Sequence, residues 1–270
     1  MNAFICHFAF EFRADIRHKQ LLMMNYLFPL GFYLLVGYIL TEVNPTFRED
    51  MIPAMMIFST LAATLLGIPI ALTTARENGI LRSYKINGVP AISILSITAS
   101  TTILHLLIMA VFITISAPLL FDAHMPVNRL NFMLIFTITT INYASISVLI
   151  GVVSSSSRES ILWSQLIFVA SILLGGLMIP HHMLPEIARE ISKLLPSTHS
   201  MNAFNSLAMG KGSDFSPWGS LVVLLLGSLV AFTLAVHLFS WDQHHATRRG
   251  HPLLGFLSFF PYAASVFFLK

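Results

Sequence analysis

The eleven histidines are the side chains of this sequence best suited to bind a metal ion, but their spacing argues against a metal site. Two adjacent pairs have a carboxylate nearby: His181 and His182 with Glu186, and His244 and His245 with Asp242. Neighbouring side chains on a helix or strand point in different directions, so adjacent histidines rarely bind one ion together. The single cysteine, Cys6, excludes a thiolate zinc site and any disulfide within the chain. We therefore expect no metal.

Motifs for nucleotide binding and for hydrolysis are also missing. The chain has no G-x-x-x-x-G-K-[ST] loop, and its one Gly-Lys pair, Gly210-Lys211, is followed by Gly212 rather than by a helix with Ser or Thr. It contains neither an H-E-x-x-H pair nor a G-x-S-x-G nucleophile turn. We therefore expect no enzymatic activity and no cofactor bound by this chain. If ATP drives its function, a partner must hold the ATP and Mg²⁺.

Three polar residues within apolar stretches are candidates for a substrate path. They are His105, Asn142 and Gln165. A polar side chain inside a membrane is costly without a partner, which makes it a functional candidate. The alternative is a structural role, in which each side chain hydrogen-bonds a neighbouring helix. The sequence leaves both interpretations open.

The elements that must position these residues are membrane helices. Of the 270 residues, 56% are hydrophobic and 10% are charged, whereas about 25% of the residues of soluble domains are charged. A helix needs about 20 mostly apolar residues to cross a bilayer. Six stretches qualify, at residues 22–40, 51–73, 91–120, 130–153, 161–179 and 219–241. We predict an all-α polytopic membrane protein with six transmembrane helices. A net charge of +3 is too small to indicate a nucleic-acid partner.

Basic residues predict which side of the membrane each loop faces. Nine flank the spans on one side: Arg13, Arg17, Lys19, Arg76, Arg82, Lys85, Arg158, Arg248 and Arg249. Five lie in the opposite loops: Arg48, Arg129, Arg189, Lys193 and Lys211. Cytoplasmic loops carry the excess of Lys and Arg. Both ends of the six-span core are therefore predicted to be cytoplasmic.

The segment before the first span has its own pattern. Arg13 and Arg17 alternate at helical spacing with Phe8, Phe12 and Ile16, which is typical of an amphipathic helix on the membrane surface. The alternative is a solvated tail that only orients the first span.

The segment between the second and third spans, residues 74–90, is too charged for hydrocarbon. Four charged residues there would together cost roughly 10 kcal/mol at the middle of a bilayer. Gly79 permits a break in the chain, and residues 80–86 can form a short helix before the Asn87-Gly88 turn. The sequence therefore predicts a short charged helix presented to the cytoplasm. An ordinary orienting loop is the alternative.

The loop between the fifth and sixth spans carries a second amphipathic segment. Residues 184–195 place apolar side chains on one face, with Pro185 near the start and Pro196 just past the end. Gly175 and Gly176, just before Pro180, would let the fifth span break. We predict an external helix that lies on the bilayer or re-enters beside the bundle.

Taken in order along the chain, four segments resemble the membrane subunit of a type-2 ABC exporter of the drug or antibiotic kind. They are the amphipathic start running into residues 26–30, the Ala-Arg-Glu-x-Gly segment at 75–82, the serine-rich segment at 154–160, and the Pro-x-x-x-Leu-Pro to Leu-Leu-Pro stretch at 180–196. The resemblance covers residues 1–251 as one transmembrane domain. It implies a permease that pairs with a separate ATP-binding cassette ATPase and with a second copy or a sister permease.

The resemblance also implies roles for individual residues. Those expected to contact or serve the ATPase are Arg76, Glu77, Gly79, Leu81, Arg82, Arg158, Glu159, Arg13 and Arg17. Those expected in the external re-entrant segment are Gly175, Gly176, Pro180, Leu184, Pro185, Leu195 and Pro196. The substrate expected from the family is an amphipathic drug, antibiotic, peptide or lipid. The expected location is the plasma membrane of a bacterium or archaeon.

Two questions stay open at this stage. Composition alone does not separate an ATP-driven permease from an ion-gradient-driven transporter or channel, although the six stretches contain no carboxylate in their cores. Residues 252–270 form an apolar tail that the family usually lacks. This tail could be a seventh span, an interfacial hairpin or a contact with another subunit.

Overall fold

The computed structural model describes residues 2–242 and 250–269, and over these ranges it contains helices and no strand, which confirms the all-α prediction. Six helical stretches are long and apolar enough to cross a membrane, in agreement with the predicted six. They are α2 (Lys19–Leu22) continuing through η1 (Met23–Leu27) into α3 (Phe28–Val43), α4 (Phe47–Leu65) with α5 (Ile68–Glu77), α7 (Ala91–Phe121), α8 (Arg129–Val153), α9 (Ser157–Leu174) and α12 (Pro217–Leu238). Arg248 and Arg249 lie outside the described residues.

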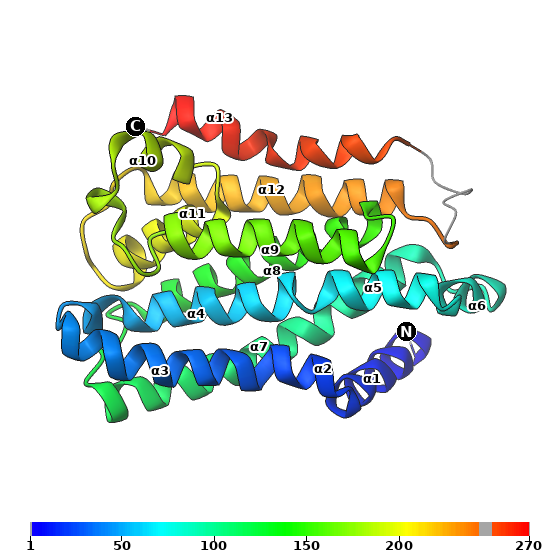
Figure 1. Ribbon diagram of the computed structural model, residues 1–270, viewed down its shortest axis with the longest axis horizontal. Coiled ribbons are helices and arrows are strands. Elements are labelled where there is room, and N and C mark those ends of the chain that lie inside the picture. Colours follow the sequence, from blue (N-terminus) through cyan, green and yellow to red (C-terminus); the bar gives the residue numbers. More distant parts are fainter. Residues whose placement is uncertain (1, 243–249, 270) are drawn as a thin grey trace.

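Two helices form the centre of the bundle, and the others surround them (Figure 1). α4 packs against α3, α7 and α8, and α8 packs against α5 and α12 as well. Every side chain of α4 from Met51 to Leu65 is buried. By contrast, α9 leaves an apolar face exposed, formed by Leu162, Trp163, Leu166, Val169 and Leu173. The centre is therefore packed like a protein core, whereas the outer helices present apolar faces to lipid or to another subunit.

The second span is broken near its middle and continues past its predicted end. α4 ends at Leu65 and α5 begins at Ile68, because Pro69 in the first turn of α5 has no N–H to continue the hydrogen-bond ladder of α4. α6 (Ile80–Ile86) follows α5 after a two-residue turn, with the bounds that the sequence predicts. α5 therefore carries the chain from the bundle to a short terminal helix.

The bundle has two distinct ends, which we call the α6 end and the α10 end. α1 (Asn2–Arg17) and α6 lie at the first of these ends, close to the N-terminus (Figure 1). The chain turns sharply between α1 and α2, since His18 has an extended backbone. At the other end, η2 (His181–Met183), α10 (Glu186–Ser192), α11 (Pro196–Ala203) and η3 (Phe204–Ala208) fill the connection between α9 and α12.

Within the predicted external helix of residues 184–195 the structure has one shorter helix, α10, and a second helix, α11, begins just past it at Pro196. α10 covers seven residues and leaves its apolar stripe exposed, with Ile187 at 78%. α11 follows directly and is completely buried, although its residues are mostly polar. The hydrophobic pattern thus located a helix in this loop but missed the deeper one.

The apolar tail packs along the outer side of α12. η4 (Pro252–Phe259) and α13 (Phe260–Phe268) run antiparallel to α12, so that Gly250 lies beside Leu238 and Leu269 lies beside Gly219. Eight 3-10 residues and nine α-helical residues extend roughly 30 Å, which is the thickness of a hydrocarbon core. The C-terminus consequently lies at the α10 end, far from the N-terminus (Figure 1). The tail is therefore about as long as a hydrocarbon core is thick and lies along α12 from end to end.

Candidate functional site

The turn between α5 and α6 depends on a glycine. Gly79 has φ of +74°, in the left-handed region that other residues adopt at a cost. Its N–H donates to the Arg76 carbonyl at 3.1 Å and its carbonyl accepts from Ser83 N–H at 3.2 Å, so the turn closes α5 and opens α6. The Ala-Arg-Glu-x-Gly segment therefore encodes a fixed change of direction at the α6 end.

Arg76 holds this turn against the end of α8. The Arg76 side chain is 4% exposed. Its guanidinium donates to the Val152 carbonyl at 3.1 Å and to the Ser154 carbonyl. These carbonyls belong to the last turn of α8, where the helix leaves backbone acceptors unsatisfied and where a cation is favoured by the helix dipole. Arg76 is thus an internal clamp in this chain and does not project toward a partner.

Glu77 forms a second clamp, on the start of α9. Its carboxylate accepts from Ser157 N–H at 2.7 Å and from Ser157 Oγ at 2.6 Å. Thr74 Oγ1 lies 3.2 Å from the same serine hydroxyl, and Thr73 Oγ1 lies 3.3 Å from Ser160 Oγ. A carboxylate at the first turn of a helix satisfies free N–H groups and complements the helix dipole. Glu77 therefore joins α5 directly to α9.

The serine-rich segment before α9 builds its own cap. Ser156 Oγ accepts from Glu159 N–H at 3.2 Å, and the Glu159 carboxylate accepts from Ser155 N–H at 2.7 Å. These two hydrogen bonds fix the start of α9 in the manner of a capping box, except that the carboxylate binds the N–H of the residue before the N-cap. Glu159 is thereby occupied within the chain, whereas Arg158 between the two partners is exposed. Of the two residues predicted here, Arg158 is the one free to face a partner.

α6 presents one buried and one exposed face. Leu81 is 2% exposed and anchors the helix to the bundle. Arg82, Lys85 and Ile86 face outward, with Ile86 at 80%. The exposed part of α6 therefore combines apolar side chains with two cations. We call Arg82, Lys85, Ile86 and Ile80 the α6 face.

The amphipathic helix α1 is attached to α6. Tyr84 Oη donates to Glu11 Oε1 at 2.8 Å, and His7 stacks obliquely on the Tyr84 ring with centroids 5.2 Å apart. Burial and the neighbouring Glu11 carboxylate raise the pKa of the Tyr84 hydroxyl, so it remains a donor. Arg13 and Arg17 are exposed on α1. These two cations and the α6 face lie at one end of the bundle.

The residues predicted for the external segment lie together at the α10 end. α9 ends at Leu174, just before Gly175 and Gly176, as the sequence predicts. A side chain at Gly175 would collide with the Ser171 carbonyl and with Ser197 of α11. Pro180 precedes η2, Leu184 is buried, and Pro185 and Pro196 open α10 and α11, with Leu195 as the N-cap of α11. The two glycines thus let α11 pack directly under the end of α9.

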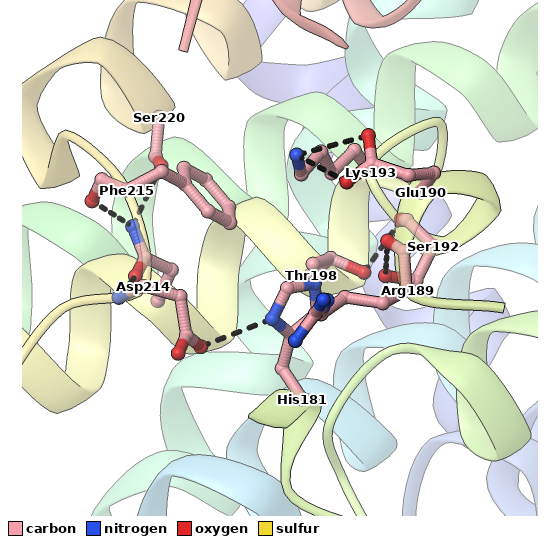
Figure 2. Close-up of polar contacts among 10 residues, drawn as sticks. His181, Arg189, Glu190, Ser192, Lys193, Thr198, Asp214, Phe215 and Ser220 are labelled. Atoms are coloured by element: carbon pink, nitrogen blue, oxygen red, sulfur yellow. Dashed lines mark hydrogen bonds and ion pairs between the residues drawn. The ribbon is translucent and has the colours of Figure 1, made fainter. Parts of the chain in front are cut away.

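A close contact between His181 and Asp214 connects this segment to the loop before α12. His181 Nδ1 lies 3.2 Å from Asp214 Oδ2, and Figure 2 shows the two side chains directed at one another. Lys211 in the same loop contacts Asp50 Oδ1 at 2.7 Å and Glu49 Oε2 at 3.0 Å. No group of three or more metal-ligating side chains occurs among the residues that the structure describes. The polar groups at this end therefore hold loops together.

The structure separates the three candidates for a substrate path. His105 of α7 accepts or donates a 2.7 Å hydrogen bond at Nδ1 with Tyr26 Oη and stacks on Phe12 of α1. Asn142 of α8 donates to the Leu224 carbonyl and to Tyr262 Oη at 2.7 and 2.6 Å. Gln165 is exposed on the outer face of α9. Two of the three, His105 and Asn142, hydrogen-bond neighbouring helices, and the three lie on three different helices.

Sequence reasoning missed the partners of these residues. Ser157 donates to Glu77 and Tyr84 donates to Glu11, yet neither pair has a distinctive spacing in the sequence. The S-x-x-E pattern at Ser156 and Glu159 is the one usable signal, because it marks Ser156 as the N-cap of α9.

Comparison with known proteins agrees with this architecture. The model of the family described as "ABC-2 type transporter" matches residues 3–209, which include the α6 face, both clamps and the helices of the α10 end. The "Putative transport permease YvfS" of Bacillus subtilis (strain 168) is 21% identical over 232 residues, which cover 83% of this chain and 91% of that protein. No solved structure shows a significant match. The chain therefore belongs to the ABC-2 type transporter family, as the membrane-embedded permease subunit of an ABC transporter.

Proposed function

We propose that the chain is the permease of an ATP-driven exporter and that it couples to a separate ATP-binding subunit through the α6 face. In this proposal the α6 end faces the cytoplasm, in accordance with the excess of basic residues there. The observation that carries the proposal is that α6 is exposed and is rigidly joined to the bundle by Gly79, Arg76 and Glu77.

The two clamps give the α6 face a mechanical path into the bundle. A displacement of α6 moves α5, and Glu77 passes that displacement to α9 while Arg76 passes it to the end of α8. α9 leads at its other end into α10 and α11. Closure of an ATPase dimer would therefore favour one arrangement of the α10 end over another, because the docked states differ in free energy.

A second permease would pair with this one across α9. Leu162, Leu166 and Val169 are exposed along α9, and the polar side chain of Gln165 is exposed among them. A glutamine facing lipid is unfavourable, whereas across a helix interface it can hydrogen-bond a partner. Gln165 thus finds its role at the contact with a second copy or a sister permease.

The cargo and the location follow from the family in this proposal. The cargo is an amphipathic drug, antibiotic, peptide or lipid, and the membrane is the plasma membrane of a bacterium or archaeon. The chain itself holds no nucleotide, and ATP with Mg²⁺ is bound by the partner subunit.

Coupling is tested by reversing the charge of one clamp. Glu77→Lys places a cation at the start of α9, where the helix dipole repels it, and it should abolish cargo-stimulated ATP hydrolysis and export by the assembled complex. Glu190→Lys at the α10 end is the matched control, because Glu190 is exposed, and it should retain both activities. Export at the normal rate by Glu77→Lys, at equal amounts in the membrane, would contradict the coupling role. Transport by the purified chain without a nucleotide-hydrolysing partner would favour the ion-driven alternative.

The pairing surface is tested by cross-linking. Cys6 is the one cysteine of the sequence, so Cys6→Ser gives a background in which Gln165→Cys can be oxidised. A disulfide-linked dimer is expected for a homodimer or, with a matching cysteine, for a sister permease. Leu229→Cys, exposed on α12, is the control and should remain monomeric.

A further inference from the structure

A cavity of about 540 Å³ lies at the α6 end between α1, α5, α6 and α7. Its walls are mostly apolar and include Ile70 of α5 and Ile94 of α7, while Glu11, Asp15 and Thr101 supply polar groups. A volume of this size is typical of sites for small organic molecules, which occupy roughly 300–1,000 Å³. Because α1 is an amphipathic helix at the level where the spans leave the membrane, the cavity is placed at the membrane interface in the proposed orientation.

Asp15 is the polar group of this cavity whose negative charge is least balanced by hydrogen bonds or by a nearby cation. Its side chain is 15% exposed and lies 3.9 Å from His105 Nε2, which is beyond hydrogen-bonding distance. His105 Nε2 is itself buried without a hydrogen-bond partner. Burial raises the pKa of Asp15 to about 6 in spite of a hydrogen bond from Thr101. The ionised carboxylate therefore gains from a cation brought into the cavity.

The chemistry of the walls selects the class of ligand. Two carboxylates, Glu11 and Asp15, face the cavity, and His18 is the one basic side chain among the described residues around it. An anion would be repelled, and a fully polar cation would leave the apolar walls uncovered. A cation with an apolar body satisfies both.

We propose that this cavity binds a lipophilic amine, with its ammonium group against the Asp15 carboxylate and its apolar body against the walls from α5 and α7. The same cavity is bounded by Tyr84 and Leu81 of α6. A bound amine therefore contacts α1 and α6 together, beside the Tyr84–Glu11 hydrogen bond. That the amine is cargo sensed by α6 rests on the proposed function, whereas the binding itself does not.

Binding is measured with the purified full chain in phosphatidylcholine nanodiscs, without any ATPase, using the fluorescent primary amine dansylcadaverine. Saturable binding is expected, and Asp15→Asn should weaken it by about tenfold, as expected for the loss of a partly buried charge pair. N-acetylated dansylcadaverine has the same body without the charge and should bind wild type and variant equally weakly. Asp214→Asn, an identical change at the α10 end, is the control and should leave the affinity unchanged.

A second variant leaves the Asp15 carboxylate in place and fills the cavity with a larger side chain. Thr98 lines the cavity on α7, so Thr98→Phe should also lower the affinity, even if Asp15→Asn were to disturb α1. Undiminished binding by both variants, or the absence of saturable binding to the wild type, would overturn the proposal. Displacement of the probe when phosphatidylethanolamine is added to the nanodiscs would assign the site to a lipid headgroup instead and would also overturn it. Failure of the Glu77→Lys test would leave this result untouched, because no ATPase takes part.

Discussion

The two ends of the bundle are fastened in different ways. At the α6 end, the charged side chains of Arg76 and Glu77 bind backbone groups at the ends of α8 and α9. At the α10 end, the buried helix α11 is held by neutral groups. Thr198 Oγ1 donates to the Ser192 carbonyl at 2.6 Å, and His199 Nε2 donates to the Lys193 carbonyl at 2.8 Å.

The difference reflects the groups that surround each contact. A charge, even the buried guanidinium of Arg76, can be used where helix ends supply complementary partial charges. All eight residues of α11 are buried, so charges there would be costly and hydroxyl and imidazole groups are used instead. Burial lowers the pKa of His199 to about 4, which keeps its imidazole neutral.

The largest expected difference between the ends is the side of the membrane on which each lies. Cys6 is exposed on α1, and Phe268 is exposed near the end of α13 at the α10 end. In intact cells, a membrane-impermeant maleimide should label Phe268→Cys in a Cys6→Ser background and should label wild-type Cys6 only after permeabilisation. Labelling of both positions from one side would show that residues 252–268 do not cross the membrane.

The next largest expected effect is the loss of folding stability when the Arg76 clamp is removed. Arg76→Ala would remove the buried guanidinium that donates to the Val152 and Ser154 carbonyls and should reduce the free energy of unfolding by about 3 kcal/mol. Lys193→Ala at the α10 end removes an ion pair with the exposed Glu190 and should have a much smaller effect, because exposed ion pairs contribute little to stability. Thermal unfolding in nanodiscs compares the two. Equal losses would mean that the clamp at the α6 end does not stabilise the fold.

Replacing a glycine by alanine at each end should give a smaller difference in stability. At Gly175 a new Cβ would meet the Ser171 carbonyl and Ser197, and such overpacking costs about 1–3 kcal/mol. At Gly79 the space is open but φ is +74°, and alanine there should cost about 1 kcal/mol. Gly175→Ala is therefore expected to lower the unfolding temperature more than Gly79→Ala. The reverse order would show that α11 adjusts easily beneath α9.

The features that the sequence predicts well are those with a strong local signal. Long apolar stretches locate all six spans, and the turn residues Gly79 and Asn87-Gly88 correctly mark the start and the end of α6. The outward exposure of Arg82 and Arg158 also agrees with the charge pattern. In each case the property depends on residues adjacent in the chain, so the sequence pattern contains the information.

The features that were missed depend on distant partners. α11 is rich in serine, threonine and histidine, and its burial is possible only because neighbouring backbone groups accept its hydrogen bonds. The burial of Arg76 depends on carbonyls 76 and 78 positions away in the chain. The position of the apolar tail depends on Gly227 of α12, which makes room for Tyr262. No local pattern reports such pairings.

The smallest expected effect is a pH-dependent change in how firmly α1 is attached at the α6 end. Burial raises the pKa of Asp15 from 3.8 to about 6, so the attachment of α1 to α7 is most stable below about pH 4 and weakens as the pH rises through 6. Glu11, His18 and His105 face the same carboxylate. A spin label on Cys6 should be more mobile at about pH 7.5 than at about pH 5, and Asp15→Asn should remove the change. His18→Gln should preserve it, and a pH response that persists in Asp15→Asn would assign the titration to one of the three neighbours.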